Sequence, residues 1–197
     1  VKTADTVENI KEENLAWTDS TVFKIFSLNV VEGSAETALS KPASIAISKR
    51  TAKKYFPFTS ALGKSLILDN NYHFTVTAVY DDIPQASHFH FDFLMSLLGD
   101  LPPAKEAQRT ALFERYNFRT YLLLRPGADA KALESKLTGF IEKYRGLQSP
   151  NGSFSMERFR ASGNKHEMTL MPLLDIHLES HLDGEFESNG SMTYVYL

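Results

Sequence analysis

Residues 65–80 read SLILDNNYHFTVTAVY, and their pattern decides the fold class. Ser65–Leu68 and His73–Tyr80 are two runs of strand-forming residues, and alternate positions from Phe74 onward form one apolar face. Asp69–Tyr72 separates the runs, and Asn tolerates the positive φ that a tight turn requires. The stretch therefore predicts an antiparallel β-hairpin.

Upstream of this hairpin, the sequence predicts a strand followed directly by a helix. Ala43–Ile47 is a short apolar run typical of a strand. Ser48 can cap a helix over 49–56, and Pro57 ends it because proline cannot continue the helical hydrogen bonding.

Periodicity and turn residues predict six further elements. They are a helix over 22–26 capped by 18–20, a strand that begins at Phe89, a polar helix over 104–116, a strand over 119–125, a helix between Asp129 and Gly146, and a strand over 167–174. The order of the last three suggests a βαβ-like unit, with the long loop 147–166 before its returning strand. Strands alternating with helices and hairpins favour the α+β class.

The composition excludes several kinds of site. The 197-residue chain is 43% hydrophobic, large enough to bury a core, and has no Cys, which excludes thiolate zinc sites, disulfides and cysteine nucleophiles. A formal net charge of -3 gives no cationic field for nucleic acid, so no nucleic-acid partner is expected. No apolar run approaches the roughly 20 residues that span a bilayer. Val1 follows no leader and Tyr194–Leu197 is an apolar, strand-like end, so we expect a fragment of a longer protein.

Candidate chemical sites are weak. The His88/His90 and His177/His181 pairs have spacings that metal sites use, but their surroundings favour hydrogen-bonded or exposed imidazoles, and we predict no metal or other cofactor. The cations of the helix over 49–56 predict only a solvated face. Eight carboxylates at strand ends are expected to accept backbone hydrogen bonds. They are Asp81, Asp82, Asp92, Asp175, Glu179, Asp183, Glu185 and Glu187.

A series of short motifs in a fixed order carries a family resemblance. They include Pro42-x-Ser44-Ile45-Ala46-Ile47-Ser48, Ala52-x-x-Tyr55-Phe56, Leu62-Gly63-Lys64-x-Leu66, Phe74-x-Val76-x-Ala78-Val79-x-x-Asp82-x-Pro84, Ser87-His88 and, far downstream, Pro172-Leu173-x-Asp175-Ile176-His177-Leu178-x-Ser180. Together they resemble the MacB-like periplasmic core domain of FtsX-type ABC transporter permeases, particularly the variety common in Bacteroidetes. Pro57 and Ala78 depart from the family pattern, which usually has Gly at both places.

The resemblance implies a porter-like, βαβ or ferredoxin-like lobe, about 1–60 and 115–197, and an inserted, more β-rich lobe, about 61–114. It implies a non-catalytic domain on the periplasmic side of the inner membrane, between two transmembrane helices, with the second following Leu197. A cytoplasmic ABC ATPase, a second permease copy and an envelope protein are the implied partners. Structural roles are implied for Ala52, Phe56, Gly63, Lys64, Asp82, Pro84, Ser87, His88, Asp175, His177 and Ser180.

Two other functions remain open from the residues alone. A ligand-binding sensor domain outside the membrane shares the α+β class, and a metal-dependent hydrolase would need the histidine pairs or the carboxylates. The loop 147–166 is expected to form a contact tip because of its length.

Overall fold

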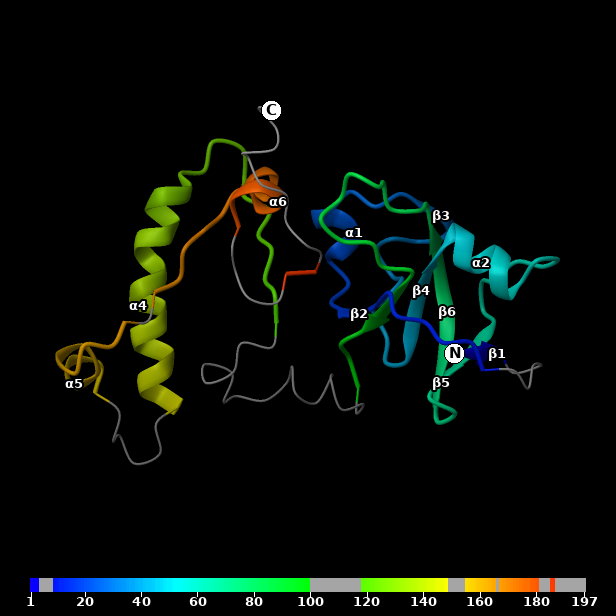
Figure 1. Cartoon of the computed structure of the whole chain (residues 1–197), viewed down its shortest axis with the longest axis horizontal. Coiled ribbons are helices and arrows are strands. Elements are labelled where there is room, and N and C mark those ends of the chain that lie inside the picture. The colour runs from blue at the N-terminus through cyan, green and yellow to red at the C-terminus, as the bar shows by residue number, and fades with distance from the viewer. Residues whose placement is uncertain (4–8, 100–117, 149–154, 166, 181–184, 187–197) are drawn as a thin grey trace. The chain divides into compact units, whose positions relative to one another are not determined.

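The computed structural model describes residues 1–3, 9–99, 118–148, 155–165, 167–180 and 185–186 (Figure 1). The chain divides into two compact units, Val1–Gln108 and Arg109–Leu197. Each unit is described by itself.

The first unit is a mixed β-sheet with a short helix on each face. Its elements are β1 (Lys2–Thr3), β2 (Leu15–Thr18), α1 (Val22–Ile25), β3 (Val30–Gly33), β4 (Ser44–Ser48), α2 (Lys49–Tyr55), β5 (Ser65–Leu68), β6 (Tyr72–Tyr80) and β7 (Phe93–Ser96). The strand order is β1-β5-β6-β4-β7-β2, and β3 also pairs with β6. Strand β6 is long enough to pair with β5 and then β3 along its length. The α+β class is confirmed.

Parallel and antiparallel pairing coexist in this sheet. The pairs β4–β6 and β2–β7 are parallel, whereas β5–β6, β4–β7, β3–β6 and β1–β5 are antiparallel. The connection from β4 to β6 contains α2, as a crossover between parallel strands requires. Consequently α2 begins at one end of β4, beside the entry to β7.

Both faces of the sheet are apolar. On one face, β4 side chains Ile45 and Ile47 join a cluster against which α2 packs Ala52, Tyr55 and Phe56. On the other face, a second cluster contains β4, β6 and β7 residues together with α1. The successive residues of β4 are all buried because the strand has a layer on each side.

The predicted hairpin and the predicted strand–helix junction are confirmed. Asp69 and Asn70 form the hairpin turn with φ of 50° and 57°. The Ser48 side chain accepts a hydrogen bond from the Thr51 N–H and caps α2. The strand predicted from Phe89 begins only at Phe93. The preceding phenylalanines instead pack in an aromatic group, in which Phe89 stacks on Phe91 with ring centroids 5.2 Å apart.

The second unit is mostly helical where it is described. Its elements are α4 (Ala130–Gln148), α5 (Met156–Ala161), the 3₁₀ helix η3 (Leu173–Asp175) and α6 (Ile176–Glu179). The predicted helix after Asp129 is confirmed, and the Asp129 carboxylate accepts hydrogen bonds from the N–H groups of Lys131 and Ala132. None of the described helices is both long and apolar enough to span a bilayer.

The predictions of strands over 119–125 and 167–174 are wrong, and so is the βαβ-like unit built from them. Neither range forms a strand, and Leu122 and Leu123 are more than half exposed. A strand requires a neighbour for its backbone hydrogen bonds, and the described part of this unit provides none. The Leu170 N–H instead donates to the Glu134 carboxylate of α4.

Four more predicted features meet different outcomes. The loop 147–166 contains the end of α4 and all of α5, rather than loop throughout. The helix predicted over 104–116 and the end run 194–197 lie outside the described residues. Strands from both sides of residue 60 pair in one sheet, while the lobes expected at 1–60 with 115–197 and at 61–114 stay a prediction.

Candidate functional site

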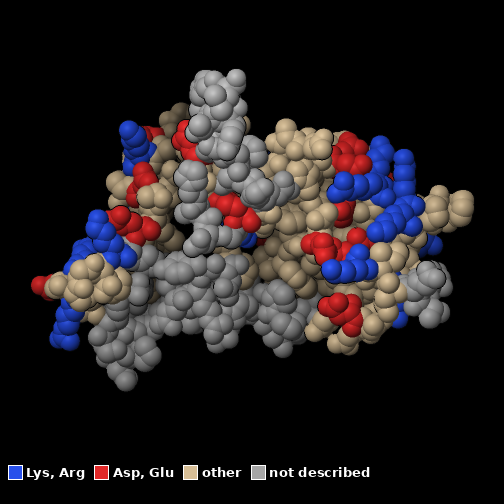
Figure 2. Space-filling model, viewed as in Figure 1, with Lys and Arg blue, Asp and Glu red and all other residues tan. Residues whose placement is uncertain are grey.

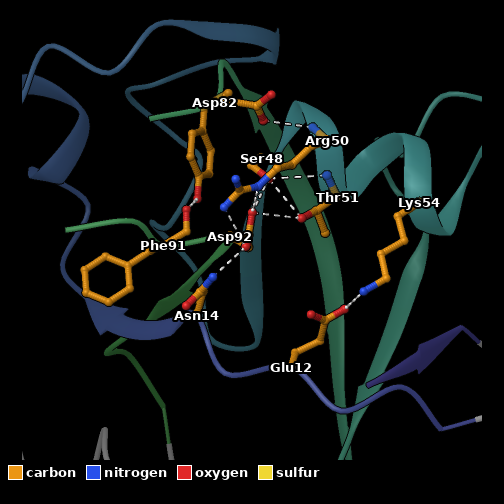
Figure 3. A network of polar contacts seen from close by, with 10 residues as sticks. Glu12, Asn14, Ser48, Arg50, Thr51, Lys54, Asp82, Phe91 and Asp92 are labelled. Carbon is orange, nitrogen blue, oxygen red and sulfur yellow. Dashed lines mark hydrogen bonds and ion pairs between the residues drawn. The ribbon is translucent and has the colours of Figure 1, made fainter. Parts of the chain in front are cut away.

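Among the described residues of the first unit, the carboxylate of Asp92, just before β7, has the most hydrogen-bond partners. Asp92 is 8% exposed, and three segments meet around it. These segments are the stretch 9–14, the junction between β4 and α2, and the entry to β7 (Figure 3). We call residues 9–14 the strap.

Side chains from the β4–α2 junction form one half of this cluster. The Arg50 guanidinium binds Asp92 with two nitrogens, Nε to Oδ1 at 2.6 Å and Nη2 to Oδ2 at 2.9 Å. The Ser48 hydroxyl donates to Oδ1 at 2.8 Å, and the Thr51 hydroxyl lies 3.3 Å from the same oxygen. Because Ser48 caps α2, the same residue fixes the helix start and binds the carboxylate.

The strap supplies the other half. The Asn14 amide donates to Oδ2 of Asp92 at 3.1 Å, and the Asn14 carbonyl accepts from the backbone N–H groups of Asp92 and Phe93 at 2.8 and 3.2 Å. The backbone carbonyl of Asp92 in turn accepts from the Ser48 N–H at 2.9 Å. Main chain and side chain of Asp92 therefore join the strap to the start of α2.

These contacts favour the charged forms of Asp92 and Arg50. Burial by itself raises the pKa of Asp92, but hydrogen bonds from Arg50, Asn14 and Ser48 and the Arg50 charge outweigh it and hold this pKa below its ordinary value. The hydrogen bond to Asp92 raises the pKa of Arg50. Burial raises the pKa of Tyr80, whose hydroxyl donates to the Phe91 carbonyl at 2.9 Å. The network is thus an ion pair in which both carboxylate oxygens of Asp92 accept hydrogen bonds from the protein itself.

A second carboxylate fixes the strap to the other end of α2. Glu12 Oε1 accepts from the Lys54 ammonium at 2.6 Å and from the Tyr55 hydroxyl at 2.7 Å. Figure 2 shows Lys and Arg side chains gathered over α2, with acidic side chains beside them. Three of the four α2 cations have carboxylate partners, so the predicted solvated face is largely paired.

The candidate histidines form no metal site among the residues that the structure describes. His90 Nε2 lies 3.0 Å from the Pro84 carbonyl, and the His88 ring packs against Phe26 and Phe89. The side chain of His177 and all of His181 lie outside the described residues. Among described residues, no group of three or more His, Asp or Glu is placed to hold a metal ion.

The remaining motif residues have clear positions, although their family roles stay predictions. Ala52 and Phe56 pack on the sheet, Gly63 turns into β5 with a φ of 76°, and Lys64 is exposed. The Asp82 carboxylate accepts from the Arg50 N–H at 2.9 Å. The Pro84 carbonyl accepts a hydrogen bond from the Ser87 N–H. Asp175 is the last residue of η3, and the Ser180 hydroxyl donates to the Glu185 carboxylate.

Sequence reasoning missed Glu12, Asn14 and the binding role of Arg50, and it treated Asp92 as an ordinary strand-end carboxylate. One signal was present: Asp92 lies between two phenylalanines at the entry to an apolar strand. A carboxylate in such a place must be paired, because an isolated buried charge is very costly. The partners are 41 to 78 residues away along the chain, and no local pattern identifies them.

Comparisons with known proteins give three results. A family model described as the MacB-like periplasmic core domain matches residues 2–140. A domain of a putative permease protein from Porphyromonas gingivalis is similar at 19% identity and a TM-score of 0.51, over 68% of this chain and 60% of that one. The periplasmic region of MacB from Actinobacillus actinomycetemcomitans is similar at 12% identity and a TM-score of 0.43, over 77% of this chain and 66% of that one. No curated protein matches significantly.

Proposed function

The chain belongs to the family of MacB-like periplasmic core domains, and from this we propose that it transmits ATP-driven conformational change in an ABC transporter permease. In this proposal it projects from the inner membrane between two transmembrane helices. A cytoplasmic ATPase drives a permease dimer, and the domain moves against a substrate or an envelope partner protein. The chain spans about 60% of the putative permease domain to which it is similar, so the action of the whole protein belongs to this proposal.

One observation carries the non-catalytic part of the proposal. The most connected ionisable group of the first unit, Asp92, is fully engaged by donors from its own fold. A catalytic carboxylate or base needs a free position toward a substrate. The Asp92 cluster instead joins the β4–α2 junction to the entry of β7, which gives this carboxylate a structural role.

The gene and the membrane topology of the parent protein test the proposal. It requires hydrophobic segments of about 20 residues close to both ends of the domain. Because the chain has no Cys, a Lys11→Cys substitution provides a unique label site within it, on a side chain that is 85% exposed; any Cys elsewhere in the parent protein is first replaced by Ser. Ala46→Cys is the matched control, since Ala46 is 0% exposed.

We expect a membrane-impermeant maleimide to label the Lys11→Cys parent in cells whose outer membrane has been permeabilised, and to leave Ala46→Cys unlabelled. Labelling of Lys11→Cys only after the inner membrane is lysed would refute the periplasmic location. A parent gene without hydrophobic segments near the domain would refute the membrane attachment.

A further inference from the structure

The strap links the two edges of the sheet. Strand β1 forms one end of the strand order and β2 forms the other, and the chain passes from β1 to β2 through residues 4–14. Ile10 pairs with Val1 beside β1, and Asn14 binds Asp92 and Phe93 at the start of β7, the strand that pairs with β2. The strap therefore crosses from one side of the sheet to the other.

Polar contacts hold the strap, and the apolar core does not. None of residues 9–14 is buried, and none belongs to either core cluster. In this respect the strap differs from the following strand β2, whose Leu15 and Trp17 pack against the core. The strap is attached by the backbone pair between Ile10 and Val1, the Glu12 contacts to Lys54 and Tyr55, and the Asn14 contacts to Asp92 and Phe93.

Release of the strap would leave no buried charge without a partner. Without Asn14, the Asp92 carboxylate keeps Arg50, Ser48 and Thr51. The Lys54 side chain is 46% exposed, so water can replace Glu12 around its ammonium group. Segments with few buried contacts open at a lower free energy than the whole domain. The contacts of Asp92 with Ser48, Arg50 and Thr51 can therefore persist when the contacts of the strap residues Glu12 and Asn14 are broken (Figure 3).

We propose that the strap is a releasable latch, which detaches from α2 and Asp92 while the sheet stays folded. Detachment breaks the contacts of Glu12 and Asn14 and leaves the central strands in place. The latch is a property of the 197-residue chain itself. Its use as a coupling element, which passes displacement from the N-terminal side to both sheet edges, rests on the proposed function.

Native-state hydrogen exchange of the 197-residue chain tests the latch. The N–H groups of Ile10, Asp92 and Phe93 donate to carbonyls of the strap or of its backbone partner, so their exchange reports detachment. We expect the exchange rates of these amides to depend little on denaturant concentration, because only a small segment opens. The amides of β4 and β6 should exchange only on global unfolding. Glu12→Ala should speed the reporter amides about tenfold, since it removes a charge-assisted contact that is partly exposed. Glu13→Ala, whose carboxylate points to an exposed lysine, is the matched control and should change nothing.

Two results would overturn the latch. In one, the reporter amides exchange with the same denaturant dependence as those of β6. In the other, Glu12→Ala leaves the exchange of the reporter amides unchanged, which would show that their opening does not break the Glu12 contacts. Either result leaves the periplasmic location and membrane attachment unaffected, because maleimide labelling and the parent gene test those separately.

Discussion

Substitution of Asp92 by Asn should destabilise the first unit by about 2–3 kcal/mol. The change keeps the side-chain volume but removes the charge and replaces one acceptor oxygen with a donor that faces other donors. Breaking a buried ion pair costs about 3–5 kcal/mol when both partners are buried. The Arg50 side chain is 53% exposed and can be rehydrated, which lowers the expected cost to about 2–3 kcal/mol.

Urea unfolding followed by tryptophan fluorescence measures this cost. Trp17 is the only tryptophan, and its ring lies edge-on to Phe74 with centroids 5.8 Å apart, so its emission reports on the first unit. With a urea dependence of about 1–2 kcal/mol/M, the Asp92→Asn midpoint should fall by about 1–3 M. Glu13→Gln is the control, because its side chain is 73% exposed and should cost less than about 0.5 kcal/mol.

The pH dependence identifies the charge as the cause. The pKa of Asp92 is depressed in the folded state, so its contribution is fully present above the unfolded value of about 3.9. That contribution is lost as pH falls through the lower folded pKa. The stability gap between wild type and Asp92→Asn should therefore narrow below about pH 4. An equal gap at pH 7 and pH 3, or a loss at pH 7 no larger than that of Glu13→Gln, would refute this reasoning.

Three further predictions concern the sheet, each measured by the same urea unfolding. Gly33→Ala should cost about 3 kcal/mol, because φ is 89° and a Cβ there would lie 2.5 Å from the Thr77 backbone oxygen. Gly63→Ala should cost about 1 kcal/mol, because φ is 76° but no atom lies near the added Cβ. Equal costs would contradict the close approach at Gly33. Tyr80→Phe should cost about 1–2 kcal/mol, since it removes the hydrogen bond that the Tyr80 hydroxyl donates to the Phe91 carbonyl. An unchanged midpoint would show that this bond contributes nothing. Phe74→Ala should cost about 3–5 kcal/mol, because Phe74 is 1% exposed. Phe58→Ala should cost less than about 0.5 kcal/mol, because Phe58 is 95% exposed. A larger cost at Phe58 than at Phe74 would contradict the assignment of the core.

Local sequence signals predicted the elements whose causes are local. The turn at Asp69 and Asn70, the Ser48 cap and the Asp129 cap depend on side chains within a few residues of the backbone they satisfy. A strand was wrongly predicted around residues 121–124 because this apolar run has the composition of a strand. Strand formation also depends on a neighbouring strand, which local sequence does not specify.

Most contacts of the candidate site could not be predicted from local sequence. Ser48 could be identified as a cap, but its second bond, to Asp92, joins residues 44 positions apart. The pairing of Arg50 with Asp92 follows from the sheet order, which places the β4–α2 junction beside the entry to β7. The family resemblance did predict the domain class, and the family model over residues 2–140 confirms it.

Hydrogen exchange of the complete permease, assembled with its ATPase, tests the central claim most directly. Exchange is compared with and without a non-hydrolysable ATP analogue, under conditions in which nucleotide binding is verified independently. If the domain transmits ATP-driven motion, amides of the first unit should change their exchange, with the largest change in the strap and β2, over residues 9–18. Identical exchange throughout the domain in both nucleotide states would contradict the account.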